Sequence, residues 1–135
     1  MARNRDLDAI LKAFDAIPKE ARKPIRAALD KGADELTGRM RYLAPEDDGD
    51  LKRSIRKTPI SDVAVRIEAG GEATTRPVRQ GVSATYDYAL GQEYGTADHP
   101  ASPFFWPSVR TLSKRVRRRV DRAIGKAVKD TWGKK

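Results

Sequence analysis

Cysteine is absent from the 135-residue sequence, and histidine occurs once, as His99. The lack of cysteine excludes disulfides, thiolate nucleophiles, iron–sulfur clusters and zinc sites built on thiolates. A single histidine is too few for a histidine-rich metal site. No stretch reaches the length of about 18 apolar residues that a membrane helix needs, and no signal-peptide core is present. We therefore expect a soluble protein that does not follow the usual secretory route.

Hydrophobic residues are scarce for so short a chain, at 39% against 35% charged residues. We expect one domain over residues 1–135, with a core built from strongly amphipathic helices. The net charge of +9 resides in residues 110–135, which hold 11 Lys and Arg against two Asp, whereas residues 1–109 hold 17 of each sign. Such a basic segment predicts an acidic partner, either nucleic acid or an acidic protein surface, with a solvated tail as the alternative.

Residues 1–44 are expected to be helical. A short first helix that stops before Pro18 is predicted by four apolar residues at helical spacing: Leu7, Ile10, Leu11 and Phe14. A second, longer stripe recurs every three or four residues, as Ile25, Ala28, Leu29, Gly32, Leu36, Met40 and Leu43. The stripe ends at Ala44-Pro45, where the residue before proline disfavours helix, and a break or kink is expected between Pro18 and Pro24. Gly32 favours the close approach of another element.

An acidic loop at Glu46–Asp50 precedes a short helix predicted over Leu51–Ile55. Asp side chains are good helix caps, so we expect them to cap this helix. A calcium loop is the weaker alternative, since the required glycine and the acidic twelfth residue are missing.

Residues 57–96 are expected to form mainly strands of a small antiparallel sheet. The clearest strand shows alternation of apolar and polar residues, with Val63, Val65 and Ile67 on one face. Gly70-Gly71 ends this strand, and Glu72–Arg79 is expected to be a mobile connection to a second strand around Val82–Tyr86. Helices, then strands, then a helix indicate the α+β class.

The C-terminal segment, residues 104–132, is predicted to be a long amphipathic basic helix. An aromatic anchor of Phe104, Phe105 and Trp106 fixes its start. The predicted apolar stripe consists of Val109, Leu112, Val116, Val120, Ala123, Ile124 and Ala127. The predicted basic face consists of Lys114, Arg115, Arg118, Arg119, Arg122, Lys126 and Lys129.

Catalytic signals are weak throughout the sequence. His99 is the only candidate imidazole base and precedes Pro100 in a predicted loop, and no phosphate-binding glycine loop occurs. The carboxylates that could hold catalytic metal ions, Glu68, Asp87, Glu93 and Asp98, have no spacing that shows convergence. We therefore expect no enzyme, and we assign no catalytic, cofactor-binding or metal-binding residue.

Four motifs occur in a fixed order: AP at 44–45, GDLKRSI at 49–55, YALGQEYGT at 88–96 and PFFWP at 103–107. In this order and at these spacings the chain resembles the gene-product-ten-like family of tailed-phage proteins. The resemblance implies a non-enzymatic virion protein at the head-to-tail junction, of the tail-completion or tail-terminator type. It also implies a ring, usually of six subunits, assembled in the bacterial host cytoplasm.

The partners that the resemblance implies are further copies of this chain, the tail tube protein and a head-side connector or stopper protein, with no membrane. Candidate interface residues carried over from the motifs are Glu93, Tyr94, Gly95, Thr96 and Phe104. For Gly95 the alternative is a turn that requires positive φ, and for Tyr94 and Phe104 it is packing in the core.

The basic face of the C-terminal helix has two candidate uses. Arg115, Arg118, Arg119 and Arg122 could contact a neighbouring subunit or tail protein, or they could contact packaged DNA. The second use leads to the alternative function, a small basic protein that binds nucleic acid through this helix. No helix-turn-helix precedes it, and no aromatic residues alternate with the basic ones to stack on bases.

Overall fold

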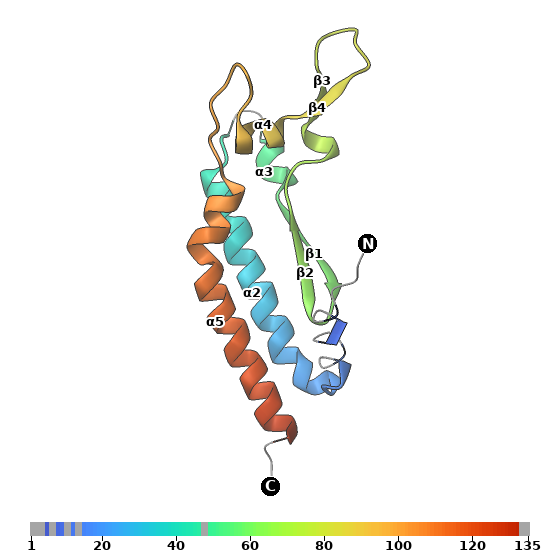
Figure 1. The fold of residues 1–135 in the computed structure, drawn as a ribbon, viewed down its shortest axis with the longest axis vertical. Helices are drawn as coiled ribbons and strands as arrows, with labels where there is room; N and C mark the ends of the chain where they lie inside the picture. The colour runs from blue at the N-terminus through green and yellow to red at the C-terminus, as the bar shows by residue number, and fades with distance from the viewer. Residues whose placement is uncertain (1–4, 6–7, 10–11, 13–14, 47–48, 133–135) are drawn as a thin grey trace.

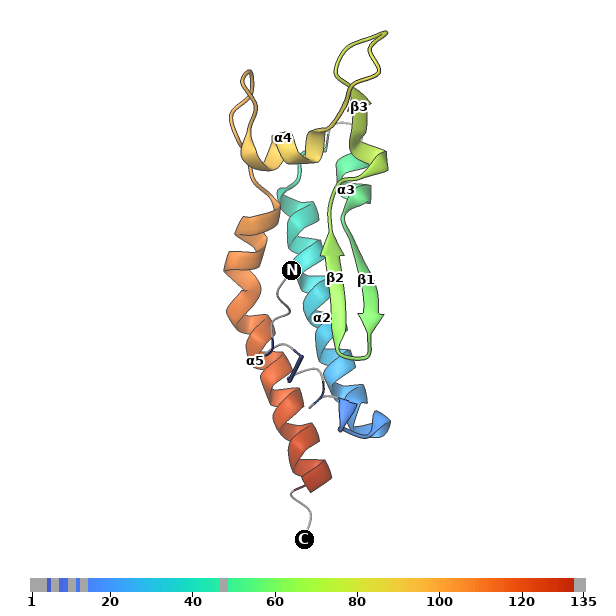
Figure 2. The same ribbon diagram turned by 45° about the vertical axis from the view of Figure 1, so that its right-hand side comes forward.

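The structure is a computed structural model that describes residues 5, 8–9, 12, 15–46 and 49–132. Two long antiparallel helices, α2 (Lys19–Leu43) and α5 (Phe105–Trp132), lie side by side along the molecule. A hairpin of two strands lies along α2 on the side away from α5, and this order holds in both views (Figures 1 and 2). The fold is α+β, as predicted. The four apolar residues that predicted the first helix, Leu7, Ile10, Leu11 and Phe14, lie outside the described residues.

Helix α2 confirms the second predicted stripe. It begins after Pro18, whose backbone is extended, and ends at Ala44, which is extended at φ −70° and ψ 139° before Pro45. The chain therefore breaks at Pro18, while Pro24 lies inside the helix. The stripe residues are buried or half-buried against α5 and the hairpin.

Helices α2 and α5 approach closely at Gly32. A Cβ atom at this position would lie 2.6 Å from Val116 Cγ1 on α5, so only glycine fits without a shift of the neighbouring side chain. One buried cluster at this helix pair consists of Ile17, Ile25 and Ala127. The larger cluster lies at the other end of the pair and contains Met40, Ala44, Leu51, Ile55, Ala89 and Phe104.

The hairpin corrects the predicted strand pairing. Strand β2 (Ala64–Glu68) is the predicted strand, but its partner is β1 (Arg56–Ser61), with Arg56 opposite Glu68 and an irregularity between Pro59 and Ser61. All residues of β1 are exposed, and its sequence shows no alternation of apolar and polar residues. Sequence periodicity therefore did not predict this strand. The segment around Val82–Tyr86 pairs elsewhere.

A second two-stranded sheet projects from the end of the molecule that bears α4, formed by β3 (Thr75–Pro77) and β4 (Thr85–Asp87) (Figure 1). The expected mobile connection Glu72–Arg79 instead contains the 3-10 helix η1 (Glu72–Thr74) and β3. Helix α4 (Tyr88–Tyr94) follows, within the segment that was expected to be mainly strands.

Asp87 joins these pieces through its carboxylate. It accepts hydrogen bonds from Gly71 N at 2.7 Å, Thr74 Oγ1 at 2.5 Å and Ala89 N at 2.9 Å. Burial raises the pKa of this carboxyl, but the three hydrogen bonds outweigh burial and hold the pKa below its ordinary value. Asp87 thus caps α4 and fixes η1 at the same time.

Helix α3 (Asp50–Ser54) corrects the capping prediction. Its N-cap is Gly49, at φ 79°, and no side chain caps it. Asp50 lies in the first turn and pairs with Arg53 and, at 2.7 Å, with Arg76. The two described acidic residues of this loop, Glu46 and Asp50, therefore form ion pairs within the chain, Glu46 with Lys52.

Candidate assembly surface

Glu93 caps helix α5 from a distance. Its Oε2 accepts hydrogen bonds from the backbone amides of Phe104 at 2.8 Å and Phe105 at 2.9 Å, and its Oε1 accepts one from Trp106 at 2.9 Å. The carboxylate is buried and is placed there by α4, which ends one residue later. A negative group at this position also complements the positive end of the helix dipole.

The first turn of α5 has no unsatisfied amide. Pro107 stands at the third helical position and has no N–H to satisfy. Ser108 is buried, and its Oγ donates to the carbonyl of Phe104 at 2.7 Å. Because Glu93 and Pro107 together account for the free donors of this turn, α5 begins at a fixed residue.

The other motif residues also make contacts within the chain. Tyr94 accepts a hydrogen bond at its hydroxyl from Trp106 Nε1 at 2.8 Å. Gly95 has φ 83°, and a Cβ there would lie 2.8 Å from Ala101 N. Thr96 orders the loop that follows, since its Oγ1 accepts from Asp98 N and His99 N at 3.3 and 3.1 Å.

These contacts describe the motif within one subunit. Gly95 has the positive φ that the turn interpretation expects. Phe104 is fully buried in the larger core cluster, as the core interpretation expects. Tyr94, by contrast, is 64% exposed, so it is not a core residue. Contact of the motif residues with another subunit stays a prediction.

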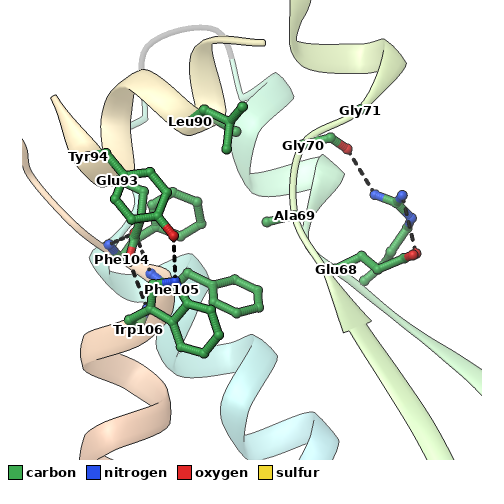
Figure 3. Close-up of a pocket in the computed structure, with 12 residues that line it drawn as sticks. Glu68, Ala69, Gly70, Gly71, Leu90, Glu93, Tyr94, Phe104, Phe105 and Trp106 are labelled. Atoms are coloured by element: carbon green, nitrogen blue, oxygen red, sulfur yellow. Dashed lines mark hydrogen bonds and ion pairs between the residues drawn. The ribbon is translucent and has the colours of Figure 1, made fainter. Parts of the chain in front are cut away.

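Beside this cap lies an open groove of about 370 Å³ (Figure 3). Its apolar lining consists of Ala69, Ala89, Leu90, Tyr94, Phe104, Phe105 and Trp106, and we call it the apolar groove. Leu90 from α4 lies toward the end of β2, and the hydroxyl of Tyr94 points toward Trp106. Sequence analysis missed Leu90, whose 61% exposure on α4 gives no signal until the helix is known.

The polar groups of the apolar groove are already engaged. Both oxygens of Glu93 accept from backbone amides. Arg56 donates to the carbonyls of Ser54 at 2.7 Å and Gly70 at 3.0 Å, and it pairs with Glu68 at 3.3 Å. The groove therefore offers apolar contact and few free polar groups.

Exposed apolar side chains gather at the same end of the molecule. Of the nine most exposed large hydrophobic residues in the described part of the chain, seven belong to elements of this end: Tyr42, Val78, Val82, Tyr86, Leu90, Tyr94 and Trp106. Large contiguous apolar patches are uncommon on monomers and mark interaction sites.

The basic face of α5 divides into two parts. Arg119 is largely buried and pairs with Glu35 of α2 at 2.6 Å, and Arg115 approaches the same carboxylate at 3.4 Å. The hydrogen bond from Arg119 lowers the pKa of Glu35, against the opposing effect of burial. These two arginines thus join α2 to α5, which the helical periodicity alone did not reveal.

Five of the seven remaining cations of α5 form a ladder along its outer side, and Arg117 and Lys129 lie outside this series. Arg110, Lys114, Arg118, Arg122 and Lys126 are spaced four residues apart, and all are exposed. Within the described chain, no ion pair involves any of them. Successive charges lie about 6 Å apart along the helix axis. Like charges at this spacing destabilise a helix when nothing neutralises them.

The structure places no catalytic group set in the described residues. His99 lies in the exposed loop after Gly95, and no group of three or more acidic or histidine side chains there could hold a metal ion. Among the same residues, no helix is long and apolar enough to cross a bilayer.

Residues 8–95 match a protein family described as "Bacteriophage HK97-gp10, putative tail-component". This span includes the first two motifs and the third without its last residue, Thr96, so that Glu93, Tyr94 and Gly95 lie at its end. No curated protein and no solved structure matches the chain significantly. Since the match covers well over half of the sequence, the chain belongs to the HK97-gp10-like family of phage tail components.

Proposed function

We propose that this protein is a structural virion protein at the head-to-tail junction of a tailed phage or phage-like particle. It forms a ring of six subunits that terminates the tail tube and joins it to the head-side connector or stopper protein. The family supports a tail component. The observation that carries the proposal is the exposed apolar end around α4, which a free monomer leaves in water.

This end fits an assembly protein better than an enzyme. Leu90 and Tyr94 are more than half exposed, yet both stand on a helix that Asp87 and Glu93 hold in place. Fixed apolar side chains reduce the entropy lost on association. A closed ring requires two different patches on each subunit, and the elongated molecule has room for both. The protein would assemble in the host cytoplasm and remain in the virion.

Electron microscopy of the purified protein, alone and mixed with tail tubes, tests the proposal. We expect rings on one end of the tubes, even if the free protein is monomeric. Particles assembled without this protein should contain tails of abnormal length that do not join heads. Normal tails joined to heads in its absence would refute the proposal.

The cation ladder supports a second candidate function, binding of duplex DNA. Five exposed cations with about 6 Å between neighbours could neutralise phosphates along one strand. The same ladder could face acidic surfaces of neighbouring tail proteins, and we favour that use because no base-reading motif accompanies it.

A further inference from the structure

The apolar groove is suited to an apolar polypeptide segment. A volume of about 370 Å³ would hold about a dozen water molecules at the density of liquid water. Most of these waters would lie against apolar carbon, so their release favours binding. A small polar ligand needs convergent polar groups to orient it, and those of this groove are engaged by the chain itself.

One segment of the same chain has the matching properties. Residues 78–84 form the tip of the β3–β4 hairpin, and we call them the arm. Val78 and Val82 are exposed on the arm, which is closed by hydrogen bonds from Val78 N to Ala84 O and from Val82 N to Arg79 O. An isolated two-stranded hairpin is marginally stable in water, so docking against another surface would stabilise the arm.

The arm is placed to reach another molecule. Figures 1 and 2 show it projecting beyond α4, away from the body of the chain, while the groove lies between the start of α5 and the end of β2. The arm and the groove are thus two different surfaces at one end of the subunit. Repetition of a contact between unlike surfaces generates a ring when the rotation closes.

Strand addition at β1 is a poorer route to assembly. The free edge of β1 contains Lys57 and Pro59 and an irregularity after Pro59. Charged residues, proline and bulges are the features that keep an edge strand from pairing with another chain.

We propose that the arm of one copy docks into the apolar groove of the neighbouring copy, with Val82 against Leu90. This contact rests on the ring of the proposed function and names the surfaces that close it.

The absence of cysteine makes a direct test available. Two single variants, Val82→Cys and Leu90→Cys, carry tags of different length and are mixed with tail tubes under mild oxidation. We expect a disulfide-linked heterodimer, which can only be intermolecular. The matched control uses Ile60→Cys in place of Val82→Cys. Ile60 is 52% exposed and Val82 is 40% exposed, but Ile60 lies on β1 and not on the arm. The control pair should give no more than background.

A second experiment identifies the occupant of the groove. Leu90→Cys labelled with a benzophenone maleimide should capture a peptide from the arm of another copy. Capture of a tail tube peptide at this site would overturn the inference. Rings seen by microscopy without a Val82–Leu90 disulfide would also overturn it while leaving the proposed function intact, whereas absence of rings from tubes would refute the proposed function itself.

Charge substitution gives a readout that does not depend on cross-linking. Val82→Glu or Leu90→Lys alone should reduce the fraction of tubes that carry rings about tenfold, because each buries an unpaired charge. The double variant should recover rings, since the new charges meet across the contact. Ile60→Glu should have no effect. All four variants should melt like the original protein, because the altered side chains are exposed in the monomer.

Discussion

At the scale of single residues, Glu93 joins two helices through one carboxylate. Its side chain extends from α4, and its two oxygens accept hydrogen bonds from three consecutive backbone amides at the start of α5. The family motif thus contains a buried capping residue between an exposed tyrosine and a glycine with positive φ. Within one subunit, this charged side chain stabilises the fold.

Substitution of Glu93 tests this role. Glu93→Ala should lower the free energy of unfolding by about 3 kcal/mol or more, because buried amides lose their acceptor. Glu93→Gln should cost roughly half as much, since one carbonyl oxygen remains. Urea unfolding measures both. Glu72→Gln is the control, because Glu72 is exposed, and it should stay within about 0.5 kcal/mol. A Glu93→Ala variant as stable as this control would contradict the capping role.

Glu35 predicts a pH dependence of stability. Its pKa is lower in the folded protein than its ordinary value, chiefly through the hydrogen bond from Arg119. The contribution to stability is therefore complete above the unfolded pKa of about 4.3 and is lost as the pH falls through the lower folded pKa. Glu35→Gln should cost about 1 to 3 kcal/mol at neutral pH.

The difference between the original protein and Glu35→Gln should shrink as the pH falls below about 4. Denaturant unfolding at several pH values measures it. Glu20→Gln serves as the control, because the pair of Glu20 with Lys23 is exposed and contributes little at any pH. A difference that is independent of pH would show that the charge of Glu35 is not the source of its effect.

At the scale of elements, the packing of α2 on α5 depends on one glycine. Gly32→Ala places a methyl group 2.6 Å from Val116 Cγ1, and we expect a loss of about 1 to 3 kcal/mol because the helices must separate. Gly38→Ala in the same helix meets nothing within 4 Å and should stabilise the protein by about 0.5 to 1 kcal/mol. Thermal unfolding of both variants checks the contrast. Equal effects would mean that the helices do not touch at Gly32.

The elements that sequence analysis predicted are those with a periodic apolar face. Helices α2 and α5 turn an apolar stripe toward each other, and in strand β2 Val65 and Ile67 are half-buried while Arg66 is exposed, so their spacing is visible in the sequence. Strand β1 is exposed throughout and held by backbone pairing, and α4 has only two buried residues. Neither leaves a periodic signal.

Features of the site that depend on residue type alone were predictable. Features that depend on contacts between residues far apart in the sequence were not. Positive φ at Gly95 and the aromatic anchor at Phe104 follow from residue type. The bond of Glu93 to Phe104, and the pair of Arg119 with Glu35 over 84 residues, depend on how the chain folds back. No spacing in the sequence encodes such a contact.

At the scale of the whole molecule, the cation ladder separates the two candidate functions. Lys114, Arg118, Arg122 and Lys126 can be replaced by Gln together, because all are exposed and Arg115 and Arg119, which hold Glu35, are retained. If DNA binding is the main function, the original protein should bind duplex DNA, and the logarithm of its binding constant should fall with the logarithm of salt concentration with a slope of about −4. The variant should then lose binding.

We expect instead weak binding of free duplex by the original protein and unjoined heads and tails with the variant. A control variant with the same change in net charge replaces four other exposed cations by Gln. These residues are not part of the ladder: Lys12, Lys19, Lys31 and Arg39. The control variant should join heads and tails normally. Tight duplex binding at physiological salt, together with normal joining in the ladder variant, would favour the DNA-binding function.

The exposed apolar residues lie at one end of an elongated chain, and this position would give a ring of such subunits a direction along its axis. Subunits that meet only through this end would build an annulus with two unlike rims. One rim would carry the loops after Gly95 and the other the free ends of the α2–α5 pairs (Figure 1). Only one rim of such a ring can match the end of the tail tube, so the ring would bind the tube in one orientation. If the outer rim does not match the inner rim of a second copy, no further ring can bind and the tube would end there.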